Sequence, residues 1–98
     1  MKRYWVYILS NRYYTVLYTG VTADLERRIK SHRNGYGSRF TKRYNVKMLL
    51  YFEEYSNLKK AKKRELVVKK YKRDWKMNLI HEMNPTKKDL FPNINELI

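Results

Sequence analysis

Arg28 and His32 place a guanidinium and an imidazole one helical turn apart in a stretch that predicts a helix. They share one helix face with Leu25 and Ile29, because these four positions follow the i, i+3, i+4, i+7 spacing. Leu25 and Ile29 are typical core residues, so the two polar side chains lie at the edge of the inward face. Two interpretations are open: functional groups that face a site, or a solvated cation and a surface histidine that flank the core.

Glu65 is a carboxylate on an otherwise apolar helix stripe. It lies four residues after Ala61 and three before Val68, so the three share one face of a second predicted helix. A carboxylate in such a position is costly unless it is paired or bound to a metal ion. The alternative to a metal ligand is a salt bridge with Lys62 or Lys69 at helical spacing.

Tyrosine is unusually abundant, with ten in the 98 residues. Most of these rings must pack in or around the core, and stacking on nucleobases is another use of such rings. Tyr7 and Tyr18 fall near each other across a predicted hairpin, on faces that the sequence alone does not fix.

The elements that must position these residues follow from periodicity and capping. Runs of β-branched and aromatic residues predict strands, while Thr22 or Asp24, and later Ser56 or Asn57, are predicted helix caps. The predicted strands are 4–10, 16–21 and 46–55, the predicted helices end near 33, 73 and 83, and residues 35–45 form a basic loop. The order β-β-α-β-α-α predicts an α+β fold, a small three-stranded, mainly antiparallel sheet flanked by helices.

The length of 98 residues predicts one domain, 1–98, with residues 84–98 as a C-terminal tail. In the third strand, alternation predicts that Val46, Met48, Leu50 and Phe52 share one face. Trp75, at the start of the last predicted helix, is expected in the core, with a stacking platform for bases as the alternative.

The charge balance favours a polyanionic partner. There are 23 Lys and Arg against 9 Asp and Glu, a net charge of +14. Nucleic acid is favoured over a membrane, because the chain has no apolar run of about 18 residues and begins without a signal-peptide core. The absence of cysteine excludes disulfides and thiolate metal sites, and it fits the cytoplasm.

Two segments predict a surface that follows phosphates: the loop 38–44, and residues 58–74 with nine Lys or Arg. The alternative is a merely solubilising face. The candidate nucleic-acid-binding residues are Arg39, Lys42, Arg43, Lys62 and Lys69. Neither segment has a base-reading motif, so we expect little sequence preference.

Four motifs occur in order along the chain: Trp5-Val6-Tyr7, Tyr18-Thr19-Gly20, Arg28-x-x-x-His32 and Glu65. With this ordered set the chain resembles the GIY-YIG nuclease superfamily, and within it the small stand-alone bacterial proteins called excinuclease-like. Trp5, Val6 and Thr19 depart from the glycine and isoleucines of the family name. A family asparagine late in the fold has two candidates, at positions 78 and 84, and is not assigned.

The resemblance implies a divalent-metal-dependent endonuclease that cuts DNA in preference to RNA, by shape rather than by sequence, with a role in DNA repair. Glu65 would hold Mg²⁺ or Mn²⁺ and Arg28 would stabilise charge on the phosphate. Tyr7 would take a proton from water, His32 would accept it onward, and Tyr18 would orient the phosphate or share the role of base. These five residues are expected to converge on one concave surface.

Two alternatives to the enzyme are a non-catalytic nucleic-acid-binding module on the same fold, and a basic scaffold that acts through a protein partner. The presence of the whole residue set favours the enzyme.

Overall fold

Strand β1 (Tyr4–Ser10) runs through the middle of a three-stranded sheet with the order β2-β1-β3. It pairs antiparallel with β2 (Leu17–Thr22) and with β3 (Met48–Tyr55). All residues of β1 from Trp5 to Ser10 are buried, as expected of a central strand that is covered on both faces. The computed structural model describes residues 2–98, and it confirms the predicted α+β class and strand pairing.

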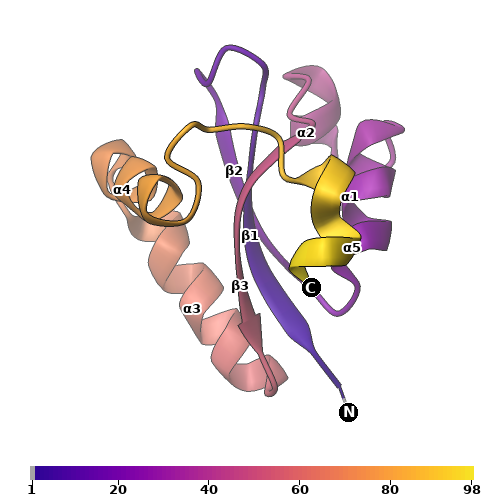
Figure 1. Cartoon of the computed structure of the whole chain (residues 1–98), viewed down its shortest axis with the longest axis vertical. Helices are drawn as coiled ribbons and strands as arrows, with labels where there is room; N and C mark the ends of the chain where they lie inside the picture. The colour runs from indigo at the N-terminus through magenta and orange to yellow at the C-terminus, as the bar shows by residue number, and fades with distance from the viewer. Residues whose placement is uncertain (1) are drawn as a thin grey trace.

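Helices cover both faces of the sheet (Figure 1). Helices α1 (Leu25–Arg33) and α2 (Arg39–Arg43) lie on one side, together with a C-terminal segment made of η1 (Phe91–Asn93) and α5 (Ile94–Leu97). Helices α3 (Leu58–Lys70) and α4 (Arg73–Met83) lie on the other side. The predicted order of elements is therefore confirmed, with three short helical segments added.

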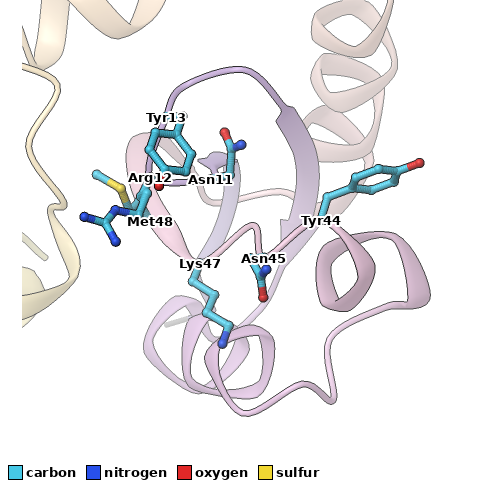
Figure 2. Close-up of a pocket in the computed structure, with 7 residues that line it drawn as sticks. All are labelled: Asn11, Arg12, Tyr13, Tyr44, Asn45, Lys47 and Met48. Carbon is cyan, nitrogen blue, oxygen red and sulfur yellow. The ribbon is translucent and has the colours of Figure 1, made fainter.

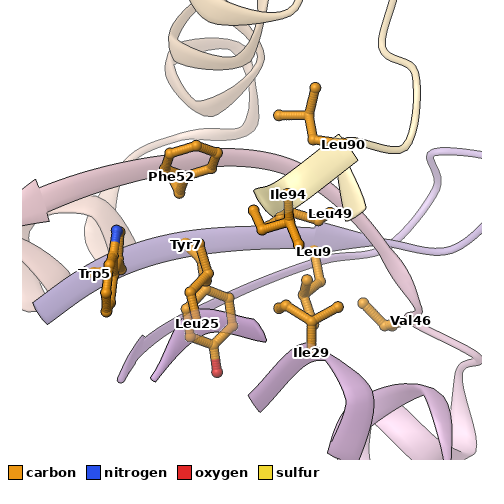
Figure 3. Packing of buried hydrophobic residues seen from close by; sticks show 10 residues of the cluster. All are labelled: Trp5, Tyr7, Leu9, Leu25, Ile29, Val46, Leu49, Phe52, Leu90 and Ile94. Atoms are coloured by element: carbon orange, nitrogen blue, oxygen red, sulfur yellow. The ribbon is translucent and has the colours of Figure 1, made fainter. Parts of the chain in front are cut away.

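Each face of the sheet has its own apolar cluster. The cluster on the α1 side, drawn in Figure 3, contains Trp5, Tyr7, Leu9, Leu25, Ile29, Val46, Leu49, Phe52, Leu90 and Ile94. The cluster on the α3 and α4 side contains Ile8, Leu50, Tyr51, Val68 and Ile80. The alternating side chains of β1 thus supply both cores.

Side-chain caps fix where the helices begin. Asp24 accepts a hydrogen bond from the Arg27 amide at 3.1 Å, and Asn57 accepts one from the Lys60 amide at 3.1 Å. These two caps were among the predicted alternatives. Ser38 caps α2 in the same way, inside the segment for which the sequence predicted only a basic loop.

The face prediction for β3 is wrong because the strand contains an irregularity. The pairing register shifts opposite Ile8, which leaves Leu50 as an extra residue in β3. Val46 and Phe52 pack on the α1 side, whereas Met48 and Leu50 pack on the α3 side. A bulge moves later side chains to the other face, and simple alternation does not account for it.

Trp75 is also placed differently from its prediction. Its side chain is 57% exposed, and its ring meets Tyr71 edge to face at 5.3 Å between centroids. Helix α3 ends at Lys70 and α4 begins at Arg73, so Trp75 lies in the exposed first turn of α4.

The C-terminal tail packs against the domain. Leu90 and Ile94 are buried in the α1-side cluster, while Leu97 remains 48% exposed. Asp89 accepts hydrogen bonds from the backbone amides of Leu49 and Phe91, and it forms an ion pair with Arg33. The segment is therefore fastened to β3 and to α1.

Asn84 joins the end of α4 to β3 and to the tail. Its buried amide donates to the carbonyl oxygens of Leu50 at 3.2 Å and Lys88 at 2.7 Å, and its side-chain oxygen accepts from the Lys88 amide at 3.2 Å. Asn78, the other candidate for the family asparagine, is exposed. The contacts of Asn84 are structural ones.

Asn84→Ala is expected to lower the free energy of unfolding by about 2–3 kcal/mol, because it removes these bonds and leaves the Leu50 carbonyl buried without this partner. Urea or thermal unfolding measures the change. Asn78→Ala, on the same helix but exposed, is the matched control and should change stability by less than about 0.5 kcal/mol. Equal effects of the two substitutions would contradict the assignment.

Candidate active site

The Tyr7 ring lies across the backbone of the edge strand. Tyr7 is paired with Gly20, and a Cβ atom at Gly20 would be 2.4 Å from the Tyr7 hydroxyl oxygen, closer than any side chain allows. Tyr18, two residues before Gly20, lies on the same face, and its ring centroid is 6.4 Å from that of Tyr7. Gly20 is therefore required by space, because the Tyr7 ring occupies the position where its side chain would be.

Helix α1 brings two polar side chains to the Tyr7 hydroxyl. Arg28 donates through Nε to this oxygen at 3.4 Å, and the His32 Nε2 atom is 3.0 Å from it. His32 is fully buried and Arg28 is half-buried. The Tyr18 ring meets the His32 ring edge to face, with 5.4 Å between centroids. Four of the five predicted residues thus form one cluster, which we call the Tyr7 cluster (Tyr7, Tyr18, Arg28 and His32).

The hydrogen bonds assign the proton positions. The Thr41 hydroxyl has one proton, and when it donates to the Ser38 carbonyl oxygen its own oxygen accepts from His32 Nδ1. A neutral His32 ring then accepts the Tyr7 proton at Nε2. The His32 proton then sits on Nδ1, which donates to the Thr41 hydroxyl at 3.0 Å. The Thr41 hydroxyl donates to the Ser38 carbonyl oxygen at 3.2 Å. The result is a directed chain of hydrogen bonds from Tyr7 through His32 into α2.

The residues behind His32 were missed by the sequence analysis. Thr41 is fully buried, and a Cβ atom at Gly37 would be 2.0 Å from His32 Nδ1. The available signal was Ser38-x-x-Thr41, a cap followed by a second hydroxyl, next to a glycine. It pointed to a local turn, and nothing in the sequence indicated that the turn contacts α1.

Burial governs the protonation of this pair. Burial raises the pKa of Tyr7 to about 12, and the hydrogen bond from Arg28 opposes that rise. Burial lowers the pKa of His32 to about 4, and the positive charge of Arg28 acts in the same direction. At neutral pH the pair is therefore a neutral phenol that donates to a neutral imidazole. Both pKa shifts hold the shared proton on the Tyr7 oxygen at rest, so its transfer to the imidazole requires a change in the charges around the pair.

Among residues 2–98, Glu65 makes no hydrogen bond with the Tyr7 cluster. It is on α3, which packs on the face of the sheet opposite α1, and its side chain is 15% exposed. It forms a salt bridge with Lys69 at 3.4 Å, one of the two pairings that the sequence offered. Its charge still acts on Tyr7, because the Glu65 carboxylate is the smallest of the causes that raise the pKa of Tyr7, after burial and Tyr18.

The edge strand β2 brings the two sides of the sheet together. A shallow depression there is lined by residues of β2, α2, α3 and α4: Leu17, Tyr18, Thr19, Phe40, Lys69 and Lys76. Burial lowers the pKa of Lys76. Tyr18 belongs to the Tyr7 cluster and Lys69 is the salt-bridge partner of Glu65, so the depression lies between the two groups.

The five predicted nucleic-acid-binding residues are all exposed. Arg39, Lys42 and Arg43 are on α2, and Lys62 and Lys69 are on α3. Helices α2 and α3 border the same depression through Phe40 and Lys69. The two basic segments, far apart in the sequence, therefore lie on either side of the β2 edge.

The family model named GIY-YIG catalytic domain matches residues 3–78. The chain belongs to the GIY-YIG family. This is a nuclease family, so the substrates of a GIY-YIG domain are nucleic acids. The matched range includes all five predicted site residues.

The GIY-YIG chain is also similar to small proteins of one named group. It is 38% identical to a UPF0213 protein of Clostridium perfringens over 91 residues, which are 93% of this chain and 97% of the relative. A UPF0213 protein of Staphylococcus saprophyticus is 37% identical over 82 residues, 84% of this chain and 99% of the relative. The solution NMR structure of a UPF0213 protein from Bacillus halodurans matches with a TM-score of 0.50 and 32% identity, over 80% of this chain and 82% of that one.

The donor set of this GIY-YIG domain suits a metal ion that keeps much of its water. Within residues 2–98, no three acidic, histidine or cysteine side chains are grouped as metal ligands would be. Glu65 offers one partly buried carboxylate, and Mg²⁺ commonly binds through one or two carboxylates, with water and phosphate oxygens in the other positions. The residues present therefore fit such an ion, provided that Lys69 gives up its pairing.

Within residues 2–98, no helix is both long and apolar enough to cross a membrane.

The free energy of unfolding of the wild-type domain should decrease as the pH falls, and His32→Gln is expected to make this decrease smaller. The folded-state pKa of His32 is about 4, below the ordinary 6.5, so the unfolded chain binds more protons in this interval. The stability due to neutral His32 is thus complete above about pH 6.5, and it is lost as the pH falls toward 4. Thermal melts across this range measure the slope.

His81→Gln is the matched control, because His81 is exposed on α4. This variant should keep the wild-type dependence of melting temperature on pH. The same slope in His32→Gln and in the wild type would mean that His32 is not held neutral by burial.

Proposed function

We propose that this protein is a divalent-metal-dependent endonuclease that hydrolyses phosphodiester bonds in DNA. The observation that carries the proposal is the hydrogen-bonded group of Arg28, Tyr7 and His32 beside the depression at the β2 edge. In this group Arg28 is a cation suited to phosphate, and the Tyr7 phenol is hydrogen-bonded to His32 as a proton acceptor.

In this proposal the Tyr7 oxygen takes a proton from the attacking water while its own proton passes to His32 Nε2. The raised pKa of Tyr7 makes a free phenolate scarce at neutral pH, so the transfer to His32 has to accompany the attack. Thr41 holds the His32 ring in the tautomer that leaves Nε2 free to accept. Arg28 stabilises the charge that develops on the phosphate oxygens, and Tyr18 orients the phosphate.

Glu65 would hold the Mg²⁺ or Mn²⁺ ion, which supplies charge neutralisation at the phosphate when bound. Its carboxylate is paired with Lys69, which also lines the depression at the β2 edge. A phosphate that reaches the depression gives Lys69 a new anionic partner, and this exchange leaves Glu65 available.

The basic residues on α2 and α3 would bind the backbone on either side of the cut. Phosphate contacts locate a strand without reading it, so we propose selection by nucleic-acid shape rather than by sequence. The resemblance to the small excinuclease-like proteins supports DNA over RNA and a role in DNA repair, and the absence of cysteine supports a cytoplasmic location.

One observation favours the alternative of a non-catalytic binding module. The Glu65 carboxylate is paired with Lys69 and shares no hydrogen bond with the Tyr7 cluster among residues 2–98. If that pairing persists on nucleic acid, the protein binds but does not cut.

Glu65→Gln should abolish nicking while leaving affinity for nucleic acid unchanged or slightly higher, because one negative charge near phosphate is removed. Arg28→Ala should slow nicking by at least about 10²-fold if Arg28 is a preorganised donor to the transition state. Nicking of branched, single-stranded and duplex substrates with Mg²⁺ or Mn²⁺, and with chelator, measures these effects beside gel-shift affinity and melting temperature.

Glu26→Gln is the matched control for the metal ligand. Glu26 forms an i,i+4 salt bridge with Lys30 at 3.0 Å on α1, as Glu65 does with Lys69 on α3, so the same type of pair is lost away from the proposed metal ligand. This variant should nick like the wild type. Full activity of Glu65→Gln would remove the metal assignment, and a wild type that binds but cuts none of the substrates would favour the binding module.

Affinity for duplex DNA should fall steeply with salt, because the net charge of +14 makes counterion release the main contribution to binding. For about five neutralised phosphates the slope of log affinity against log salt is about −4 to −5. Fluorescence anisotropy at several salt concentrations measures it. A flat response would mean that charge is not the basis of binding.

A further inference from the structure

A row of aromatic rings leads outward from the Tyr7 cluster. The Phe40 ring stacks on the Tyr18 ring at 6.0 Å between centroids and 29° between planes, and the Tyr44 ring follows at 4.9 Å from Phe40. Tyr18 also contacts His32, so the row begins inside the candidate active site. Tyr18 is half-buried, whereas the two outer rings are exposed, Phe40 at 43% and Tyr44 at 42%.

This row is not needed for the core. Thr41 is the buried residue of α2 and already anchors the helix on His32, while Phe40 and Tyr44 belong to neither apolar cluster. Large rings at the surface expose apolar area to water, which is unfavourable unless something covers them.

A pocket lies beyond Tyr44, at the tip of the β1–β2 hairpin (Figure 2). Its volume is about 470 Å³, within the usual size of a small-molecule site. The lining residues are Asn11, Arg12, Tyr13, Tyr44, Asn45, Lys47 and Met48. Tyr13 and Tyr44 stand on opposite sides of this group in Figure 2, and Tyr13 is 70% exposed. The pocket thus continues the row with further aromatic and cationic side chains.

Cations accompany the rings along the whole row. Arg43 lies over the Tyr44 ring at 5.5 Å and Arg12 lies over the Tyr13 ring at 5.4 Å. Arg39 and Lys42 flank Phe40 on α2, and Lys47 lines the pocket. An apolar protein partner would have to remove these cations from water without compensation. A nucleic-acid strand offers both complements, because its phosphates pair with the cations and its bases stack on the rings.

We propose that Phe40, Tyr44 and the adjoining pocket form a stacking site for unpaired nucleobases of the strand that is cut. Bases within a duplex stack on each other and hide their faces, so only a strand unpaired next to the cut can use these rings. The position of the cut rests on the proposed function, whereas the binding site itself does not depend on cleavage.

The test compares two strands that carry the same phosphates. Fluorescence anisotropy in chelator gives the affinity for a short oligothymidine strand and for an abasic strand of equal length. Wild-type protein should bind the thymidine strand at least about fivefold more tightly, because stacking adds free energy that the abasic strand does not have. Phe40→Leu and Tyr44→Leu should each reduce this preference by about fivefold or more and leave abasic binding unchanged.

Trp75→Leu is the matched control, an exposed aromatic at the start of α4 on the other face of the sheet. It should keep the wild-type preference, and thermal melts should show that all three variants are folded.

Equal wild-type affinity for the two strands would overturn the proposal. So would a preference that survives in both Phe40→Leu and Tyr44→Leu. If the preference is found but no substrate is cut, the stacking site stands and the nuclease proposal fails.

Discussion

The close contact between the Tyr7 ring and the backbone of Gly20 sets the geometry of the candidate site. The ring of a residue on the central strand can cross the edge strand because Gly20 has no side chain there. Its hydroxyl then reaches the inward face of α1, where Arg28 and His32 meet it. Any side chain at position 20 would push the ring away, and the hydrogen bonds that define the cluster would be lost with it.

Helix α2 provides the second constraint. Its Thr41 hydroxyl fixes the His32 ring from behind, and Gly37 leaves room for that ring at the turn before the helix. The same short helix presents Phe40 and its basic neighbours outward. This helix of five residues therefore supports His32 on one side and presents a charged aromatic surface on the other. A shift of α2 would change both the support of His32 and the position of that surface.

The electrostatics of the site combine a buried neutral pair with a strongly basic surface. Burial keeps Tyr7 protonated and His32 neutral, and Arg28 reinforces the neutral state of His32. Outside, the net charge of +14 attracts polyanions, and basic side chains of α2 and α3 border the β2 edge of the sheet. Glu65 is an acidic group within this basic surface, and it forms a salt bridge with Lys69.

Local pattern in the sequence determined the strands, most of the helix bounds, the caps Asp24 and Asn57, and the shared face of Arg28 and His32. These features depend on residues near one another in the chain, which periodicity and capping describe directly. Tertiary structure alone decided that Leu50 is an extra residue in β3, that Thr41 stands behind His32, and that the helix carrying Glu65 packs on the face of the sheet opposite α1. The physical reason is that pairing register and the packing of one element on another depend on contacts between segments that are distant in the sequence. Such contacts produce no periodic pattern of residues in either segment.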